Sequence, residues 1–556
     1  MLAATGGDFP LLSALVVTPL IGAVMIAFVG KSRTEIVRAF AMLASVCTAA
    51  LAGYLLWQFH VGDGGFQFVE DRSWVEAMGL RYILGVDGIS LWMVVLTGLI
   101  FPLVFLSSAN LNDRFKMYAI SMLILEAGIM GVFLALDLVL FFVFFEVVLI
   151  PMYLLIGIWG HERRIYAALK FFIYTMAGSA LMLAAILTLG FLHSSQTGVL
   201  TFDMRELSIW GGLAQSTAQW LFLAFFVAFA VKVPIFPLHT WLPDAHVEAP
   251  AAGSVVLAAV MLKMGTYGFL RFSLTLFPQA AVDMAPWIMV LGAIGIIYGA
   301  LVAAVQTDLK KLIAYSSVAH MGFVVIGTFS LTQPGLDGGI LTMLAHGLNT
   351  SALFFLVGFL YDRRHTREIA QFGGLWKTMP IFAGLFLVAS FASVGLPGLS
   401  GFVGEYLSLL GTFLTSRPVA VVSTVGVILA ALYLLWAFQQ VFTGEPEGDN
   451  RDTPDVSVRE IAVVAPLLIL SLVIGLYPRP VLDRINPSVE ALLDHVEEQS
   501  DWVEPSVPPA SVVHDETTEV EAGHDEAGAA ETDSGNAADD EHSIGNLEAA
   551  VPGGAK

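Results

Sequence analysis

Charged residues and cysteine are scarce in this chain of 556 residues. Asp, Glu, Lys and Arg make up 13% of it, hydrophobic residues make up 57%, and the mean hydropathy is +0.78. A water-soluble protein of this length needs far more polar surface. The single cysteine, Cys47, cannot form a disulfide within the chain, an iron–sulfur site or a cysteine-based zinc site.

Motifs for cofactor binding and for a cleaved signal are also missing. No glycine-rich fingerprint follows a strand pattern, so no nucleotide site is predicted. We expect no cofactor, no metal and no nucleic acid to bind this chain. The apolar N-terminal segment lacks a basic region and a small-residue cleavage site, so we interpret it as a first transmembrane span.

Long apolar runs recur along almost the whole sequence. A spanning helix takes about 20 apolar residues, and these runs do not alternate as barrel strands do. Helices and closed barrels are the structures that satisfy their backbone polar groups in lipid, so the prediction is an all-α polytopic membrane protein. About fourteen transmembrane helices are expected, at residues 10–30, 35–58, 88–107, 115–135, 138–158, 166–192, 218–241, 249–272, 283–304, 310–330, 338–360, 379–415, 419–443 and 459–477.

The distribution of charge predicts the orientation and a polar tail. With the N-terminus outside, 16 Lys and Arg residues fall in inner connections and 7 in outer ones, so the positive-inside rule favours both termini on the outer side. The net charge is −21, and residues 501–556 carry 14 acidic residues and one lysine. This composition is typical of disordered chain, and an acidic, disordered tail is expected over residues 485–556.

Two of the predicted spans are interrupted by proline and glycine. KVPIFPLHTWLP contains Pro234 and Pro237, and VGLPGLSGFVGE contains Pro397. These breaks lie five spans apart, and two helices separated by an odd number of spans cross the membrane in opposite directions. The sequence therefore predicts two inverted five-helix repeats, over residues 115–272 and 283–443. Three helices within residues 1–114 precede them, and a last helix at 459–477 follows. In transporters, paired broken helices indicate the ion path.

Ionisable side chains lie inside several spans, where they are rare and usually functional. Burial disfavours their charged forms, whereas a nearby opposite charge favours them. Lys232 is therefore expected to take up a proton while Glu146 is close and to release it when the pair opens. Glu126 lies nearer a span end, where it could reach water, and its role stays open. The proton would move onward through Lys263, His320, His346 and Glu405.

Two other interpretations of these side chains remain. They could be structural ion pairs or satisfied buried polar groups that hold helices together. The two histidines on adjacent spans could also ligate a haem iron, although neither a second histidine pair nor the small-residue groove of a haem bundle is evident.

Five long runs carry a resemblance to a known family: FFEVVLIPMYLLIGIWG, AFAVKVPIFPLHTWLPDAHVEAPAAGSVVLAAVMLKMGTYG, QTDLKKLIAYSSVAHMG, HGLNTSALFFLVGFLYDRRHTREI and GLPGLSGFVGEYLSL. They resemble the proton-translocating antiporter-like subunits of respiratory complex I, most narrowly the M-type (ND4-type) subunits of bacterial NADH:quinone oxidoreductase. The resemblance covers roughly residues 85–445, and its motifs are long and in order.

The resemblance implies proton translocation coupled to NADH oxidation and quinone reduction in other subunits. FMN, iron–sulfur clusters, NADH and quinone would belong to those partner subunits, and this chain would do no redox chemistry itself. Other membrane subunits, especially the L- and N-type antiporter-like ones, would be its neighbours in a bacterial plasma (inner) membrane.

The resemblance also implies a role for each matching residue. Glu146 is similar to the glutamate of span 5, Lys232 to the lysine of the broken helix and Lys263 to the central lysine. His320 and His346 match histidines of the central axis, and Glu405 takes the terminal position of the channel. The inner mouth and connections would involve His239, Asp244, His246 and the acid at the start of span 5, Asp137.

Competing functions stay open at this point. The core motifs are shared with subunits of multi-subunit Na⁺/H⁺ antiporters and with membrane-bound hydrogenases, and a purely structural membrane spacer is a further possibility. Glu405 in place of lysine and the DRRHTR loop favour the M-type subunit. The L-type subunit is disfavoured because no long amphipathic helix and extra span are expected after residue 477.

Overall fold

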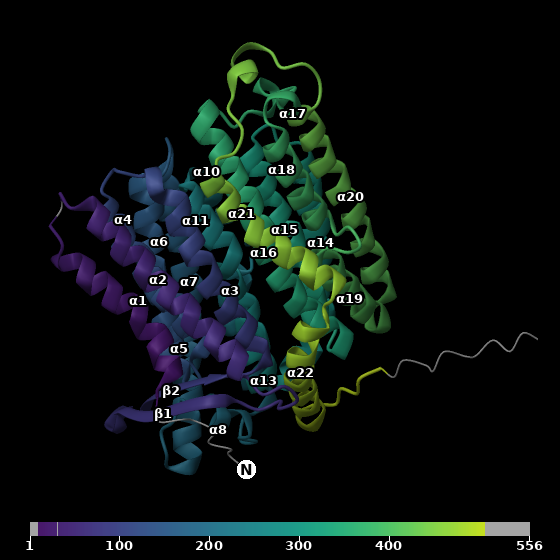
Figure 1. Ribbon diagram of the computed structural model, residues 1–556. Helices are drawn as coiled ribbons and strands as arrows, with labels where there is room; N and C mark the ends of the chain where they lie inside the picture. The colour runs from purple at the N-terminus through teal and green to yellow at the C-terminus, as the bar shows by residue number, and fades with distance from the viewer. Residues whose placement is uncertain (1–8, 31, 506–556) are drawn as a thin grey trace, which may run out of the picture. The chain divides into compact units, whose positions relative to one another are not determined.

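The computed structural model describes residues 9–30 and 32–505, which form the helical bundle of Figure 1. In this part of the chain, 12 segments are long and apolar enough to cross a membrane, which confirms the polytopic helical prediction. They are α1 (Leu11–Phe28), α2 (Thr34–Gln58), α3 (Gly88–Ser107), α4 (Phe115–Leu134), α5 with α6 (Leu138–Val147, Leu149–Trp159), α7 (Arg164–Thr197), α11 to α13 (Ala251–Leu276), α14 (Pro278–Ala304), α15 (Leu309–Phe329), α16 (Gln333–Arg364), α20 (Arg417–Phe442) and α21 (Val458–Leu476).

The two remaining predicted spans are broken where their prolines and glycines lie. The first consists of α9 (Gln215–Lys232) and α10 (Trp241–Glu248), and the second of α18 (Pro380–Val394) and α19 (Ser400–Thr415). Pro234 and Pro237 lie in the first gap and Pro397 in the second. Because proline has no backbone N–H and clashes with the preceding turn, a helix cannot continue regularly through these positions. Within residues 9–30 and 32–505, these two broken segments occupy the positions of the seventh and twelfth predicted spans, beside the 12 continuous ones.

The two runs of five spans begin on opposite faces of the bundle. At the start of α4, Lys116 donates hydrogen bonds to carbonyls at the end of α1, those of Ala27 and Val29. At the start of α14, Gln279 instead donates to Asp501, on the face where α1 begins. Spans 4–8 and 9–13 therefore cross the bundle in opposite senses, as the sequence predicted.

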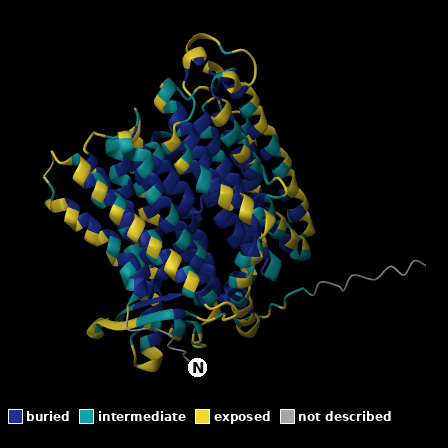
Figure 2. Ribbon diagram, in the orientation of Figure 1, coloured by how far each residue is buried: buried dark blue, intermediate teal, exposed yellow. Residues whose placement is uncertain are grey.

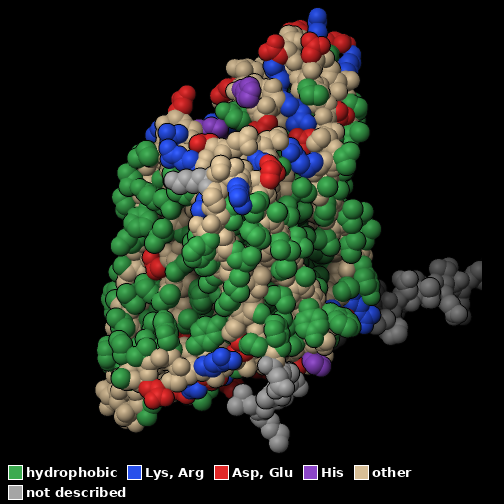
Figure 3. Space-filling view, turned by 60° about the vertical axis from the view of Figure 1, so that its left-hand side comes forward, with side chains coloured by type: hydrophobic (Ala, Val, Ile, Leu, Met, Phe, Trp, Pro, Cys, Tyr) green, Lys and Arg blue, Asp and Glu red, His purple; other side chains and the backbone are tan. Residues whose placement is uncertain are grey.

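Charge and burial follow the expectations for a membrane bundle. Figure 3 shows a broad belt of hydrophobic side chains between two polar ends, where the charged side chains gather. The most buried helices are α16 and the span Ala251–Leu276. All residues in the most apolar stretch of each are buried, compared with 33% in that of α2. Figure 2 shows the same gradient from the centre of the bundle outward. These two segments carry Lys263 and His346.

A β-hairpin covers one face, an element that the sequence analysis did not predict. Strands β1 (Gln67–Val75) and β2 (Leu80–Val86) pair antiparallel, and Gly79 adopts a left-handed conformation (φ 64°) at the turn. The Glu70 carboxylate accepts hydrogen bonds from the backbone N–H of Leu12 (2.7 Å) and from Ser13 at the start of α1. The hairpin thereby caps the first helix. We call the end of the bundle that the hairpin covers the hairpin face, and the other end the opposite face.

The predicted tail begins too early. Residues 479–499 form the amphipathic helix α22 (Arg479–Gln499), which includes residues 485–499 that were assigned to the disordered tail. Its apolar residues recur every three or four positions and are buried against the bundle, namely Val481, Ile485, Val489, Leu492, Leu493 and Val496. An amphipathic helix thus does follow residue 477, against the sequence expectation. The rest of the predicted tail, from residue 506, lies outside the described residues.

A buried ion pair joins the hairpin face to the span Ala251–Leu276. Arg271 Nη2 lies 2.5 Å from Asp87 Oδ2, and the two side chains are 7% and 5% exposed. Asp87 also caps α3 by accepting from the backbone N–H of Ile89 and Ser90, and Arg271 Nε donates to the Tyr267 hydroxyl (3.2 Å). The pair therefore connects α3 to the span that carries Lys263.

Removal of Arg271 should destabilise the subunit, because it leaves the Asp87 carboxylate buried without its counter-charge. We expect Arg271→Gln to lower the free energy of unfolding by about 3 kcal/mol. The control is Arg479→Gln, because Arg479 is 74% exposed in its pair with Asp483, and it should cost under about 0.5 kcal/mol. Thermal denaturation of the purified complex, with the amount of incorporated subunit, measures both. Equal losses in the two variants would contradict a stabilising role for the buried pair.

Candidate functional site

Glu146 and Lys232 lie near each other but are not in direct contact in this structure. Glu146 is half-buried near the end of α5, and Lys232 is the last residue of α9, 1% exposed. The Lys232 charge acts on the Glu146 carboxylate, yet no ion pair within 4.0 Å joins them among the described residues. The Lys232 ammonium lies instead 4.8 Å from the centre of the Phe145 ring. The predicted pair is therefore in an open arrangement.

The break after Lys232 is stabilised by contacts with neighbouring segments. Trp241 donates its indole N–H to the backbone carbonyl of Val231 (2.8 Å), one of the carbonyls that the interrupted helix leaves without an intrahelical donor. Gly265 lets the next span approach this break closely, since a Cβ there would lie 2.7 Å from Val233 and 3.0 Å from Lys232. The Lys232 end of α9 therefore packs directly against the helix that carries Lys263.

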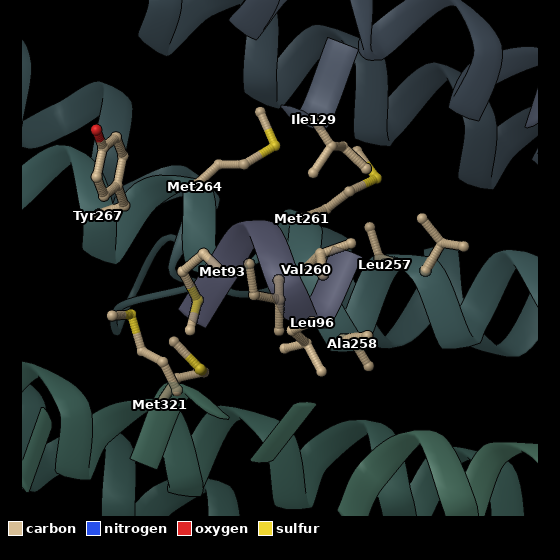
Figure 4. Close-up of a cluster of buried hydrophobic side chains, with 14 of the residues drawn as sticks. Met93, Leu96, Ile129, Leu257, Ala258, Val260, Met261, Met264, Tyr267 and Met321 are labelled. Carbon is tan, nitrogen blue, oxygen red and sulfur yellow. The ribbon is translucent and has the colours of Figure 1, made fainter. Parts of the chain in front are cut away.

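Lys263 is wholly buried and is held by two acceptors. Its ammonium nitrogen lies 2.6 Å from the backbone carbonyl of Ala258 and 2.6 Å from His346 Nδ1. A π-helical turn over Leu257–Met261 precedes it, and the wider turn makes the Ala258 carbonyl available to a side chain five residues later. Figure 4 shows the apolar side chains packed near this turn, among them Met93, Leu257 and Met261.

His320 and Glu405 continue the series toward α19. His320 Nδ1 lies 2.6 Å from Glu405 Oε1, and the hydroxyl of Ser393 lies 3.2 Å from His320 Nε2. The ring centres of His320 and His346 are 5.9 Å apart. A cavity of about 10 Å³ between these side chains is just large enough for one water. Lys263, His346, His320 and Glu405 therefore form one buried polar series across four helices.

This arrangement disfavours the haem interpretation. The cavity beside His320 and His346 has room for a water and none for a porphyrin. No group of three or more His, Cys, Asp or Glu side chains within residues 9–30 and 32–505 is placed to hold a metal ion.

Three of the four predicted connection residues lie in and after the break of span 7. Asp244 forms an ion pair with Lys170 (2.7 Å). His239 is buried, with its ring 5.0 Å from that of Tyr298. His246 is wholly buried, with its ring stacked on Phe354 at 4.7 Å and 9°. These side chains are close enough to the opposite face to shape an opening there.

Asp137 lies apart from the other connection residues, on the hairpin face. It caps α5 by accepting from the backbone N–H of Val139 and Leu140, and its backbone pairs with that of Asp203. Burial raises the pKa of Asp137 to about 6. Asp137 thus lies in the connection between α4 and α5, and because these helices cross in opposite senses, the start of α5 is on the face where α4 ends.

Some polar residues of the site carried no usable sequence signal. Ser393 is a small residue on α18 that reaches His320 on α15, although α18 packs mainly beside α16, α19 and α20. Lys310 was counted as a connection charge, yet it is 4% exposed. Glu126 was expected near water but is wholly buried, and neither carboxylate oxygen has a hydrogen-bond partner among the described residues.

Comparison with known proteins now places the chain. A family model described as "NADH:quinone oxidoreductase/Mrp antiporter, TM" matches residues 135–432. The NADH-quinone oxidoreductase subunit M of Rhodobacter capsulatus is 50% identical over 497 residues, covering 87% of this chain and 96% of the relative. The chain belongs to this family. NADH-ubiquinone oxidoreductase chain 4 of Arabidopsis thaliana is 45% identical over 488 residues, covering 87% of this chain and 97% of the relative.

Solved structures agree with this assignment. A chain of respiratory complex I from Thermus thermophilus matches with a TM-score of 0.79 and 32% identity, covering 87% of this chain and 99% of that one. A chain of the Mrp complex from Dietzia sp. matches with a TM-score of 0.76 but 22% identity, covering 88% and 100%. The second likeness shows a shared antiporter-like fold, whereas the sequence relatives of the family are subunit M proteins.

A glycine beside Glu405 provides a test of the site's backbone. Gly395 ends α18 at φ +86°, and a Cβ on it would lie 3.4 Å from Glu405 Oε2. We expect Gly395→Ala to lower the free energy of unfolding by about 1–2 kcal/mol, because the left-handed conformation is unfavourable for alanine. Gly384→Ala is the control, since nothing lies within 4 Å of its Cβ position in the same helix, and it should stabilise by about 0.5–1 kcal/mol. Thermal denaturation of the complex measures both, and a neutral Gly395→Ala would contradict the backbone argument.

Proposed function

We propose that this chain is a membrane-arm subunit of NADH:quinone oxidoreductase that moves protons across the membrane. The observation that carries the proposal is the buried series Lys263, His346, His320 and Glu405, which neighbouring helices bring into contact in the interior of an apolar bundle. Each member can bind and release a proton, and each is joined to the next by a hydrogen bond or by adjacent rings. The family supports the coupling to NADH oxidation and quinone reduction.

Glu146 and Lys232 act as the switch in this proposal. In the open arrangement, the Lys232 ammonium has aromatic rings instead of a carboxylate beside it, which disfavours its charge and favours release of a proton. Closure of the pair favours the charged lysine. The long, flexible lysine side chain allows this change without movement of the helices.

The proposal places redox chemistry and its cofactors elsewhere. FMN, iron–sulfur clusters, NADH and quinone belong to partner subunits, and the L- and N-type antiporter-like subunits are the expected membrane neighbours. The bacterial plasma membrane, with both termini outside, is the proposed setting. The side-chain charges support it, because the hairpin face carries the smaller, predicted outer set of basic residues, Arg72, Arg81, Arg205, Arg271, Arg417, Arg479 and Arg484.

An Mrp-type Na⁺/H⁺ antiporter subunit is the second candidate, favoured by the similar fold of the Dietzia complex. The two assignments predict different partners. Native mass spectrometry of the complex purified through this chain should detect NADH- and quinone-binding subunits. A complex made only of small antiporter subunits would contradict the NADH:quinone oxidoreductase assignment.

Substitution of Glu146 tests the switch and separates it from a structural spacer. We expect Glu146→Gln to leave assembly intact while lowering the proton flux through the Glu146 and Lys232 switch by about 100-fold, the scale on which a positioned acid or base contributes to proton transfer. Glu35→Gln is the control, because Glu35 is 83% exposed. The measurements are NADH-driven proton uptake in inverted vesicles and the amount of assembled complex. Wild-type pumping in Glu146→Gln would exclude the switch role.

A further inference from the structure

A polar cavity opens at the opposite face, away from Glu146 and Lys232. It has a volume of about 150 Å³, which is room for several waters. It lies between the end of α6, the start of α11, the start of α15 and the end of α16. Asp362 at its edge is exposed, so water reaches it from that face. Its ionisable lining residues are His161, Lys310, Tyr361, Asp362 and Arg367.

Lys310 is the deepest ionisable group of this cavity. It lies in the first turn of α15, and its side chain is 4% exposed, with the amine donating to the backbone carbonyl of Ala249. Arg367 is held in place by Asp308 (3.2 Å) and by the Val247 carbonyl (2.6 Å). His161 stays neutral at pH 7, because burial and the charges of Lys310 and Arg367 lower its pKa to about 4. Lys310 is therefore the group in the cavity that can both reach water and move inward.

His246 lies on α10, three residues before Ala249, whose carbonyl Lys310 bonds. The ring is wholly buried, and both nitrogens are without hydrogen-bond partners among the described residues, although a buried polar atom without a partner costs free energy. The stacking on Phe354 fixes the ring plane and leaves both nitrogens at its open edges. Phe354 belongs to α16, the helix that also carries His346.

We propose that Lys310 and His246 form a second proton intake, which carries protons from the opposite face to Lys263 and His346 without passing Glu146 and Lys232. A neutral Lys310 amine takes a proton from water in the cavity. The ammonium then gives it to one ring nitrogen of His246, and the other ring nitrogen gives a proton to Lys263, whose amine is neutral once it has passed its own proton to His346. Lys310 returns to its starting form and one proton has been delivered, while His246 is left as the other neutral tautomer and regains its first form by a turn of the ring through about 180°.

The route requires movement of Lys310, since its amine is bonded to the Ala249 carbonyl in this structure. A lysine side chain has four rotatable bonds, so release of that bond lets the amine turn toward His246. The alternative is that Lys310 serves only to hold the connection between α10 and α11 through that carbonyl. Arginine distinguishes the two roles, because it donates hydrogen bonds equally well but does not release its proton.

The inference rests on the proposed proton translocation and is tested in the intact complex in inverted vesicles. We expect Lys310→Ala, Lys310→Arg and His246→Phe each to lower the ratio of protons pumped to NADH oxidised, to about half if both routes carry equal flux. The double variant Glu146→Gln/Lys310→Ala should pump less than either single variant. Methylamine, a small base that fits the cavity, should restore pumping in Lys310→Ala and leave Glu146→Gln unchanged. Lys377→Ala, an exposed lysine on the same face, is the matched control.

Three results would overturn the second intake: wild-type pumping in Lys310→Arg, no rescue of Lys310→Ala by methylamine, or a double variant that pumps as well as Glu146→Gln alone. Lys263→Met separates this inference from the proposed function, because both routes meet at Lys263. Normal pumping in Lys263→Met would reject proton translocation through this chain as a whole. Impaired pumping in Lys263→Met, with normal pumping in Lys310→Arg, would reject only the second intake.

Discussion

The arrangement of the bundle interior depends on how the Lys263 ammonium is accommodated away from water. A charged or polar group in such surroundings needs partners, because unsatisfied it costs several kcal/mol. The π-helical turn before it makes the Ala258 carbonyl available, and α16 brings His346 to the same nitrogen. Helix packing alone would require neither the π-helical turn that frees the Ala258 carbonyl nor a histidine at position 346. Both follow from the need to give Lys263 hydrogen-bond partners.

The need of buried polar groups for partners is met differently on the two sides of Lys263: the polar side chains are continuous toward α19 and interrupted toward α9. Toward α19, each group finds the next: His346 lies beside His320, and His320 bonds Glu405. Toward α9, Lys232 is surrounded by aromatic rings and separated from Glu146. A continuous wire of hydrogen bonds across the membrane would leak protons. In the proposed mechanism, the interruption at Lys232 is the point of control, where movement of one side chain would connect or disconnect the two halves.

His246 extends this view to the face opposite the hairpin. Its buried imidazole has two nitrogens without hydrogen-bond partners among the described residues, and such groups are costly to keep. With two intakes that meet at Lys263, the subunit would collect protons from separate points on one face. Lys310 and Arg367 each bond a carbonyl at the end of α10 or just after it, so the cavity is attached to the segment that follows the break after Lys232.

Much of the fold follows from local pattern. Apolar length gives the spans, and Pro234, Pro237 and Pro397 give the two breaks, because a missing N–H acts wherever the residue stands. The ionisable residues of the spans are equally visible, since a charge in an apolar run is conspicuous without any structure. The hairpin and α22 were missed because their stability comes from packing: Glu70 reaches the start of α1, and the apolar side of α22 has meaning only against its neighbours. Residue types and order thus decide which groups are available for proton transfer. Contacts between helices far apart in sequence decide which groups meet, as shown by the open Glu146 and Lys232, the joined His320 and Glu405, and Asp137 on the hairpin face, because distance in space depends on packing that no single segment contains.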